Sequence, residues 1–348
     1  MKLNKCPGCL EAGYESYCNR CRNKLFDGSK INHNLSFTRP EFNKIKIEDS
    51  GKMSISGIQI KHSLRVENGE LILTERNGRY ILKPIPSGHF ENLEQVPANE
   101  HLTMQIASQV YNINVANNGI VFFADNEIAY ITRRFDIKED GNKFLQEDFA
   151  QIAGRTEETH GRHYKYDFSY EEIAELLKRY VNAYQIEIEK YFRIIIFNYL
   201  FSNGDSHLKN FSLYKNEEYG DYLLTPFYDL LNTSLHVPGK SDTALELFKD
   251  GYQTEAYKVG SKITKPDFVE FANRVGINNI RIEKIYNDMI TKSDTVNKLI
   301  STSFLESDVK EIYQEKYNKK LNLLHLCNLF YFYLQICHFH VPFQSLQV

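Results

Sequence analysis

The chain has 348 residues, 42% of them hydrophobic and 25% charged, with a formal net charge of −3. These values are ordinary for a globular protein that is long enough for one large two-lobed domain or two smaller domains. The small negative charge gives no reason to expect sequence-independent binding of nucleic-acid phosphates, although a local basic patch stays open. The first residues, MKLNKCPGCL, lack the apolar segment of a signal peptide, so we expect a cytoplasmic location.

Four of the six cysteines form a C-x2-C-x8-C-x2-C pattern over Cys6, Cys9, Cys18 and Cys21. In a cytoplasmic chain, two closely spaced C-x2-C pairs indicate metal ligands rather than disulfides. Four thiolates suit tetrahedral Zn²⁺ and leave no open position for chemistry, so we expect a structural zinc knuckle in a leader over residues 1–30. The eight-residue gap is shorter than the usual zinc-ribbon spacing, and four free thiols in a mobile leader remain the alternative.

Residues 31–136 predict a small β-rich lobe with one helix. The stretch from Gly28 to Phe42 indicates a linker, and alternating apolar and polar residues follow it. Asn68-Gly69 and Asn77-Gly78 each predict a hairpin turn between strands of an antiparallel sheet. PANEHLTMQIASQVYN predicts a helix with Pro97 near its start, and GIVFFAD and EIAYITRRFD predict two further strands.

Residues 137–324 predict a larger, mostly α-helical lobe. The sequence SYEE, Ser169 to Glu172, is a capping box that begins a helix. EIEKYFRIIIFNYLF is apolar around most of its circumference, which is typical of a buried central helix. FSLYKNEEYGDYLL predicts a hairpin. The expected fold class is therefore α+β, with two lobes of the kind found in protein kinases.

Residues 325–348 are expected to form an appended tail outside this fold. No charged residue occurs from Leu321 to Val348. A membrane anchor needs about 20 apolar residues, and Gln335 and the histidines of the tail interrupt such a span, so we favour an appended segment over an anchor. The spacing of the histidines and cysteines of the tail fits no standard metal site; they are His325, Cys327, Cys337, His338 and His340.

A polar run, SNGDSHLKN, directly follows the predicted central helix and contains Asp205 and Asn210 in a D-x4-N arrangement. Phosphoryl transfer uses such a pair, because an acid accepts the proton of the attacking hydroxyl and an amide oxygen holds Mg²⁺. A second metal-binding acid is then needed on a neighbouring strand. TPFYD, at the exit of the predicted hairpin, brings Asp229 beside the loop.

Lys83, in the predicted strand YILKP, and Glu100, in the predicted helix, supply the strand lysine and helix glutamate of a kinase small lobe. The stretch MSISGIQIK lies between two predicted strands and is positioned to cover the phosphates of a nucleotide, although it has one glycine and no GxGxxG. Each piece alone occurs often by chance. Their order along the chain is the order found in kinases.

From about Phe37 to Leu324 the chain resembles the HipA-family serine/threonine kinases, the toxin half of bacterial toxin–antitoxin systems. The stretches that carry the resemblance are SNGDSHLKNFSL, TPFYDLL, MSISGIQIK, YILKP, ANEHLTM and ITRRFD. The chain is most similar to the short HipT-like members, which lack the usual N-terminal subdomain and have two serines in the loop.

The resemblance implies that Asp205 is the catalytic base, that Asn210 and Asp229 hold Mg²⁺, and that Lys83 contacts the phosphates of ATP. The residues expected in catalysis are Asp205, Lys83, Glu100 and Lys209. The residues expected to contact ATP are Ser56, Gly57, Ile58, Gln59, Ile60, Lys61, Lys83, Arg133, Arg134, Phe135, His207, Leu208, Lys209, Asn210, Tyr228 and Asp229.

The same resemblance implies that Ser54 and Ser56 are regulatory autophosphorylation sites. A phosphate on either serine would place nearly two extra negative charges close to Mg-ATP and displace the loop. The alternative is that these hydroxyls only cap the turn.

Partners follow from the resemblance as well. It implies a translation-related protein substrate, typically an aminoacyl-tRNA synthetase, and a HipB-like helix-turn-helix antitoxin through which the chain meets DNA indirectly. It also implies a separate small HipS-like protein in place of the missing subdomain, and no membrane. Two other functions stay open: a small-molecule kinase, and a catalytically silent binding subunit whose cysteine knuckle contacts a partner or DNA.

Overall fold

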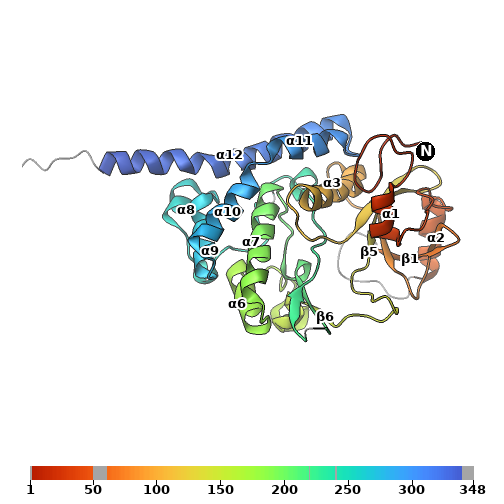
Figure 1. Ribbon diagram of the computed structural model, residues 1–348, viewed down its shortest axis with the longest axis horizontal. Helices are drawn as coiled ribbons and strands as arrows, with labels where there is room; N and C mark the ends of the chain where they lie inside the picture. The colour runs from red at the N-terminus through yellow and green to blue at the C-terminus, as the bar shows by residue number, and fades with distance from the viewer. Residues whose placement is uncertain (1, 50–60, 219, 240, 339–348) are drawn as a thin grey trace, which may run out of the picture.

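The structure is a computed structural model that describes residues 2–49, 61–218, 220–239 and 241–338. Its α+β fold places a sheet at one end of the molecule and helices over the rest (Figure 1). The strand order is β2-β1-β3-β5-β4, and all neighbours are antiparallel, as the alternating sequence predicted. The strands are β1 (His62–Glu67), β2 (Glu70–Leu73), β3 (Tyr80–Pro84), β4 (Asn118–Phe122) and β5 (Ile128–Arg133).

The two Asn-Gly pairs differ in what they connect. Asn68 and Gly69 join β1 to β2 in the predicted hairpin, and both have the positive φ that such a turn requires, 50° and 80°. The prediction of a second hairpin at Asn77 and Gly78 is wrong, because β1 lies between β2 and β3 and the connecting segment has to cross it. A Cβ on Gly78 would lie 1.8 Å from Ser63 Oγ of β1, so this crossing needs glycine.

Helix α3 (Val96–Gln109) lies between the sheet and the helical part of the molecule and is buried over most of its length. It contacts β4 and β5 on one side and α11 on the other. The short helix η1 (Leu93–Gln95) leads into it, and Pro97 occupies its first turn, where no intrahelical N–H bond is lost. The predicted helix is therefore present, and its enclosure fixes the side chains that it carries.

The helical part contains a second, smaller sheet with the order β6-β7-β8, in which β7 and β8 form the predicted hairpin. Ser169 and Glu172 form the predicted capping box at the start of α6. The elements of this part are β6 (Gln146–Asp148), α4 (Phe149–Ile152), α5 (Glu157–His160), α6 (Tyr170–Tyr180), α7 (Tyr184–Leu200), η2 (Leu208–Asn210), β7 (Ser212–Lys215), β8 (Tyr222–Leu224), η3 (Thr233–Leu235), η4 (Lys249–Gly251), α8 (Glu255–Gly260), α9 (Lys265–Arg274), α10 (Asn279–Ile290), α11 (Ser293–Thr302) and α12 (Ser307–His338).

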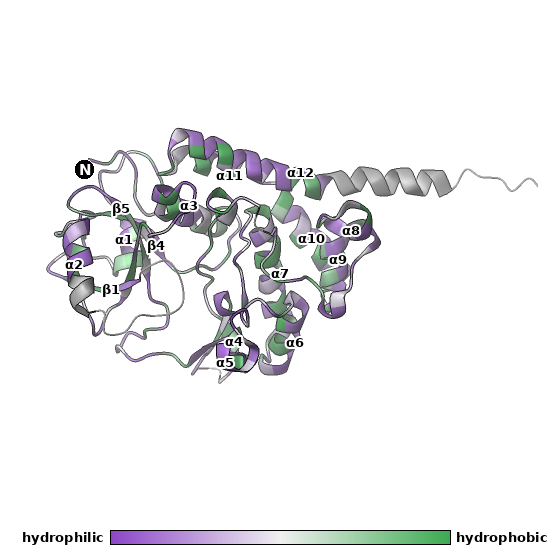
Figure 2. Cartoon of the chain, turned by 180° about the vertical axis from the view of Figure 1, so that it is seen from behind, coloured by the Kyte–Doolittle hydropathy of each residue, from purple (hydrophilic) through white to green (hydrophobic). Residues whose placement is uncertain are grey.

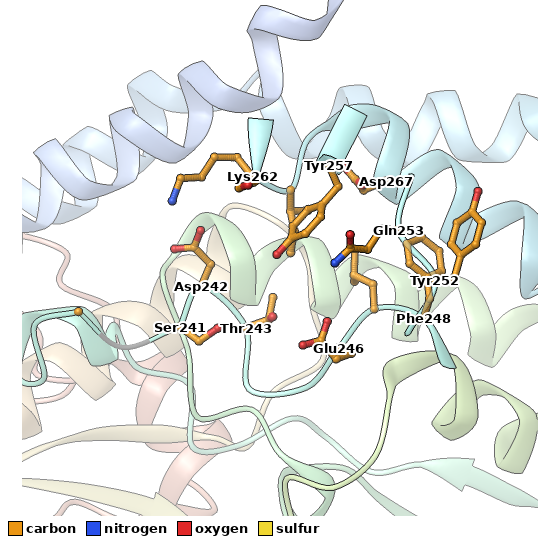
Figure 3. A pocket seen from close by; sticks show the side chains of 14 residues that line it. Ser241, Asp242, Thr243, Glu246, Phe248, Tyr252, Gln253, Tyr257, Lys262 and Asp267 are labelled. Atoms are coloured by element: carbon orange, nitrogen blue, oxygen red, sulfur yellow. The ribbon is translucent and has the colours of Figure 1, made fainter. Parts of the chain in front are cut away.

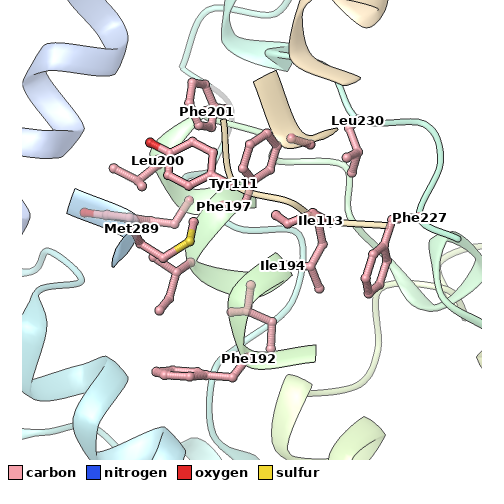
Figure 4. Close-up of a cluster of buried hydrophobic side chains, with 14 of the residues drawn as sticks. Tyr111, Ile113, Phe192, Ile194, Phe197, Leu200, Phe201, Phe227, Leu230 and Met289 are labelled. Atoms are coloured by element: carbon pink, nitrogen blue, oxygen red, sulfur yellow. The ribbon is translucent and has the colours of Figure 1, made fainter. Parts of the chain in front are cut away.

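Helix α7 is the buried central helix that its apolar sequence predicted. Figure 4 shows aromatic side chains packed around its C-terminal half. The rings of Phe197 and Phe201 lie 4.4 Å apart, and the Tyr111 ring meets Phe197 edge-on at 5.7 Å. Such pairs contribute about 0.5–1.5 kcal/mol each beyond their buried area. The polar loop that follows α7 therefore begins at a rigid point of the core.

Residues 28–42, expected as a linker, pack on the sheet instead. The backbone N–H of Leu35 donates to the carbonyl oxygen of Phe122 at 2.7 Å and continues the edge of β4. Phe42 is fully buried, and its ring lies 5.4 Å from that of Phe123. The two helices that precede the sheet are α1 (Asn19–Phe26) and α2 (Arg39–Asp49).

Helix α12 projects beyond the body of the molecule (Figure 1). Its first half contacts α11, as seen from behind in Figure 2. Its first half is anchored: Tyr313 and Tyr317 are buried in the core, and Lys320 forms an ion pair with Asp242. The helix continues without a break through residue 324, where the tail was expected to begin. Across the described ranges, no helix combines the length and the apolar character that a membrane crossing requires.

Candidate functional site

Lys83 of β3 joins two carboxylates from distant parts of the chain. Its Nζ lies 2.5 Å from Glu100 Oε1 of α3 and also pairs with Oδ1 of Asp229, which follows β8. Lys83 is 3% exposed and Glu100 is 2% exposed, so neither charge is balanced by water. Buried charges are stable only when they are paired and hydrogen-bonded. The structure thus brings together three residues that the sequence singled out.

The pKa values of this cluster follow from burial and from its charges. Burial alone would lower the pKa of Lys83, but the charges of Asp229 and Glu100 outweigh burial and hold this pKa above its ordinary value. Burial would raise the pKa of Asp229, but Lys83 and Lys61 outweigh it, so this pKa lies well below its usual range. Burial raises the pKa of Glu100, although the charge of Lys83 opposes the shift. At neutral pH, Lys83 and Asp229 are therefore both charged.

A second lysine reaches the same carboxylate. Lys61 Nζ lies 3.2 Å from Asp229 Oδ2. Asp229 has a φ of 56°, which is uncommon for a residue other than glycine, and its side chain is 29% exposed. Its carboxylate therefore faces cations and still has an open side.

Most of the predicted phosphate loop lies outside the described residues. This part includes the predicted phosphorylation sites Ser54 and Ser56 and the predicted ATP contacts Gly57, Ile58, Gln59 and Ile60. Lys61 is the first residue after it that the structure describes.

The polar run after α7 is held in place by its own side chains. Asn198 of α7 donates from Nδ2 to Ser206 Oγ at 2.7 Å and accepts at Oδ1 from Asn203 Nδ2 at 3.0 Å. The backbone N–H of Gly204 donates to Thr233 Oγ1 at 2.9 Å. Ser206 and Asn203 are buried, and the acid between them is not. Most of the polar residues therefore fix the loop, and the acid between them is less deeply buried than they are.

That carboxylate belongs to Asp205, which is half-buried and accepts a hydrogen bond from the Tyr166 hydroxyl at 2.6 Å. The Tyr166 ring meets the ring of His207 edge-on at 5.1 Å. Burial lowers the pKa of His207 to about 4, although the charges of Asp205 and Asp229 act in the opposite direction. Both carboxylates therefore lie near enough to His207 to act on its charge.

Asn210 and Asp229 lie on two segments that a hydrogen bond joins. Tyr228, which precedes Asp229, donates from its hydroxyl to the carbonyl oxygen of Lys209, which precedes Asn210, at 2.9 Å. Within the described part of the chain, Asn210 Oδ1 is buried and has no hydrogen-bond partner. Buried polar atoms without partners are rare in proteins. An amide oxygen and a carboxylate are ligands that suit Mg²⁺, so these residues fit such an ion.

The side chains of the predicted ATP contacts Arg133, Arg134 and Phe135 have different partners. The ring of Phe135 lies 5.6 Å from that of Tyr228, close to Asp229. Arg134 forms a bidentate ion pair with Asp136. Arg133 pairs with Asp27 of the leader at 2.5 Å. Phe135 therefore lies near the charged cluster, whereas the two arginine side chains are held by other partners.

Two predicted ATP contacts in the Asp205 loop, Leu208 and Lys209, differ in how deeply their side chains are buried. The side chain of Leu208 is fully buried in the core, so this residue can reach a nucleotide only through its backbone. Lys209 is half-buried. The sequence did not predict Tyr166 as a site residue. Its contact with Asp205 spans 39 residues, and the sequence around it, HYKYDFSY, carries no catalytic motif.

The four cysteines of the leader converge on one point. Their Sγ atoms all lie within 4.8 Å of one another, and those of Cys9 and Cys18 are 3.8 Å apart. Four sulfurs around zinc, with bonds of about 2.3 Å, lie about 3.8 Å from one another. The N–H groups of Gly8 and Cys18 point at Cys6 Sγ at 3.4 and 3.2 Å, and a Cβ on Gly8 would lie 2.7 Å from Cys21 Sγ. The donor set and its geometry therefore fit a tetrahedral metal ion.

The leader that carries this cluster links the two parts of the molecule. The Nε2–H of His101, next to Glu100 on α3, donates to the carbonyl oxygen of Gly8 at 2.9 Å. Lys5 Nζ donates to the carbonyl oxygen of Thr302, at the end of α11, at 2.8 Å. The cysteine cluster is therefore connected to the helix that positions the partner of Lys83.

A cavity of about 310 Å³ lies elsewhere, between the segment that follows β8 and the helices α8 and α9 (Figure 3). Polar and aromatic side chains line it, among them Asp242, Glu246 and Tyr252. Neither the Asp205 loop nor Lys83 lines it. We place the candidate site at the charged cluster because the chemically matched groups converge there.

Comparisons with known proteins identify the family to which the chain belongs. The family model described as the HipA-like C-terminal domain matches residues 53–296. A Haemophilus influenzae protein named "Putative kinase" is 30% identical over 327 residues, which cover 87% of this chain and 91% of the relative.

Solved structures show the same fold at low sequence identity. A chain of the Shewanella oneidensis MR-1 toxin–antitoxin complex of HipA, HipB and operator DNA aligns with a TM-score of 0.59 at 20% identity, over 81% of this chain and 69% of that chain. The Helicobacter pylori proinflammatory kinase CtkA aligns with a TM-score of 0.50 at 12% identity, over 75% and 90% of the two chains. Together with the match over residues 53–296, these findings show that the chain belongs to the family of proteins with a HipA-like C-terminal domain.

Proposed function

We propose that the chain is an ATP-dependent protein serine/threonine kinase with a two-lobed kinase fold and the toxin component of a bacterial toxin–antitoxin module. The observation that carries the proposal is the buried Lys83, which meets Glu100 of α3 and Asp229 beside the Asp205 loop. A strand lysine held by a helix glutamate, next to an acid that binds Mg²⁺, is the arrangement that protein kinases use. Membership of the HipA-like family supports the same reading.

The residues would divide the reaction as follows. Asp205 accepts the proton of the substrate hydroxyl while the hydroxyl oxygen bonds to the γ-phosphorus and the bond from that phosphorus to ADP breaks. Lys83, oriented by Glu100, and Lys209 contact the phosphates. Asn210 and Asp229 would hold Mg²⁺, which would neutralise charge on the phosphate oxygens.

The remaining ATP contacts belong to the proposal as well. Phe135 would form a wall for the adenine, and the backbone at Arg133 and Arg134 would contact it. Ser54 and Ser56 would be autophosphorylation sites of the loop that includes Lys61.

Zinc in the leader is a separate part of the proposal. Cys6, Cys9, Cys18 and Cys21 would bind one structural Zn²⁺, since four thiolates saturate a tetrahedral ion. The geometry of the four sulfurs supports this. We also propose the division into a leader (1–30), a small lobe (31–136), a helical lobe (137–324) and a tail (325–348).

Partners are proposed from the family. The substrate would be a translation-related protein such as an aminoacyl-tRNA synthetase, and a HipB-like antitoxin would link the chain to DNA. The solved complex of HipA, HipB and operator DNA supports this partner. A small HipS-like protein would be a further partner.

Phosphoproteomics after induced expression in a bacterial host tests the proposal. Wild type and Asp205→Asn are compared at equal protein levels. We expect new phosphoserine or phosphothreonine on a few translation proteins and on the chain itself, only with wild type. Identical phosphoproteomes, together with turnover of ATP on a hydroxylated metabolite, would instead show a small-molecule kinase.

A further inference from the structure

The contact between Tyr166 and Asp205 is fixed from both sides of the hydrogen bond. On the side of the loop, the N–H of Leu208 donates to the carbonyl oxygen of Lys165 at 3.2 Å, and the ring of His207 packs against that of Tyr166. The segment before α6 therefore follows the Asp205 loop over several residues. The hydroxyl reaches the carboxylate as part of this extended contact.

The neighbours of Tyr166 are also held from behind. Arg155 pairs with Asp167 at 2.8 Å, and its guanidinium lies 4.8 Å from the centre of the Phe168 ring. The hydroxyl of Tyr170, the first residue of α6, donates to the carbonyl oxygen of Ser206 at 3.0 Å. The chain on the C-terminal side of Tyr166 is thus anchored to Arg155, which follows α4, and to Ser206 of the Asp205 loop. The phenol of Tyr166 therefore has little freedom to turn away from Asp205.

The chemistry of the pair gives this contact a consequence for phosphoryl transfer. A base in a kinase has to present a deprotonated oxygen to the substrate hydroxyl in one orientation. A hydrogen bond donated to an ionised carboxylate favours its charged form and fixes the rotation of its plane. Burial and the bond to Asp205 raise the pKa of Tyr166 above its ordinary value, so the phenol keeps its proton and remains a donor.

We propose that Tyr166 is a positioning residue of the active site, whose hydroxyl holds the carboxylate of Asp205 in the orientation that receives the substrate proton. This inference rests on the proposed function, in which Asp205 is the base. Tyr166 does not enter the proton balance: the substrate proton moves to Asp205, the oxygen–phosphorus bond forms, ADP leaves, and the phenol retains its hydrogen.

Tyr166→Phe tests this inference, because it removes the hydroxyl and keeps the ring that packs on His207. The probe is the rate of ADP production by the purified full chain in Mg-ATP, measured from pH 5 to pH 8. We expect the maximal rate to fall about 10-fold, the KM for ATP to stay within about twofold, and the acid limb of the pH profile to move up by about one unit.

Tyr164→Phe is the matched control. Tyr164 lies on the same segment and is half-buried, and its hydroxyl makes no hydrogen bond to any described residue. We expect wild-type rates and an unchanged profile for this variant. Thermal unfolding of both variants measures any loss of fold.

Three results would overturn the inference. They are an unchanged rate in Tyr166→Phe, a faster rate, which would make the phenol a blocking group, and a slower rate with an unshifted profile, which would make its role purely structural. Asp205→Asn separates this inference from the proposed function. If Asp205→Asn is inactive while Tyr166→Phe equals wild type, only the role of Tyr166 is wrong. If Asp205→Asn stays active, the proposed base itself is wrong.

Discussion

The hydroxyl of Tyr228 donates a hydrogen bond of 2.9 Å to the carbonyl oxygen of Lys209 and ties the segment of Asp229 to the loop of Asn210. The same hydroxyl lies 2.7 Å from Ser212 Oγ. The two proposed magnesium ligands therefore keep a fixed relation, although they are far apart in the sequence. The bond is a structural feature that a single substitution can remove.

Tyr228→Phe should weaken the binding of Mg²⁺ at the proposed site. The substitution removes both part-buried hydrogen bonds of this hydroxyl, to the carbonyl oxygen of Lys209 and to Ser212 Oγ, and each bond contributes about 0.5–1.5 kcal/mol. We expect the Mg²⁺ concentration for half-maximal ADP production to rise about 3- to 10-fold. Tyr214→Phe, on the neighbouring β7, serves as the control. Equal magnesium dependence in the two variants would contradict the proposed role.

Glu100→Gln should reduce both activity and stability. Lys83 is buried, and without the charge of Glu100 it depends on Asp229 alone. We expect a rate of ADP production about 10- to 100-fold lower and an unfolding free energy about 1–3 kcal/mol lower. Glu94→Gln, exposed just before α3, should change neither quantity. Wild-type turnover in Glu100→Gln would show that Lys83 does not need this partner.

The stability of the protein should fall as the pH drops below about 6.5. Burial lowers the pKa of His207 to about 4, whereas an unfolded histidine has a pKa of about 6.5. Between these values only the unfolded state takes up the proton, so His207 alone lowers the unfolding free energy by about 3 kcal/mol from pH 6.5 to pH 4. His101, whose pKa burial also lowers to about 4, adds a loss of similar size. Asp229, whose pKa is lowered, adds its own loss only below about pH 3.9.

His207→Gln should remove the part of this slope that belongs to His207, while His101, whose pKa burial also lowers to about 4, keeps its own part. Denaturant unfolding at several pH values measures it, and His163→Gln, which changes an exposed residue of the neighbouring segment, should keep the wild-type slope. The prediction is wrong if both variants show the same dependence between pH 6.5 and pH 4.

Removal of metal from the leader should affect the active site as well as the leader. His101, next to Glu100, contacts Gly8 of the cysteine knuckle, so loss of the knuckle reaches the helix that orients Lys83. We expect about one zinc per chain, and after chelation a melting temperature lower by at least about 5 °C together with reduced ADP production.

Substitutions separate the two groups of cysteines. Cys9→Ser should reproduce the effect of chelation, and Cys337→Ser in the tail should retain the metal. A fully metal-free preparation with wild-type stability and turnover would refute a structural zinc.

Local signals predicted which elements form, and tertiary pairing decided what they meet. The alternating residues around Asn68-Gly69, the capping box at Ser169 and the apolar helix before Asp205 each act within a few residues, and each element is present. Asn77-Gly78 carries the same turn signal as Asn68-Gly69, yet β3 pairs with β1 because β1 offers a second edge. A turn sequence specifies a bend and does not specify the partner strand.

The residues of the candidate site also fall into those that local sequence predicted and those that depend on tertiary structure. Lys83, Glu100 and Asp229 could be predicted as site residues because the three follow one another along the chain in the order found in kinases, each on the expected element. The structure places Lys83 in contact with both acids. Tyr166 could not be selected, since its contact with Asp205 depends on the path of a long connection between α4 and α6. The packing of residues 28–42 was also missed, because only scattered apolar residues such as Leu35 and Phe42 anchor this polar stretch.

The most direct test of the central claim is transfer of label from γ-labelled ATP by the purified chain, wild type against Asp205→Asn, with folds matched by circular dichroism. We predict label on serine or threonine with wild type and a rate about 100- to 10,000-fold lower with the variant. Transfer by Asp205→Asn at a rate near that of wild type would contradict the account.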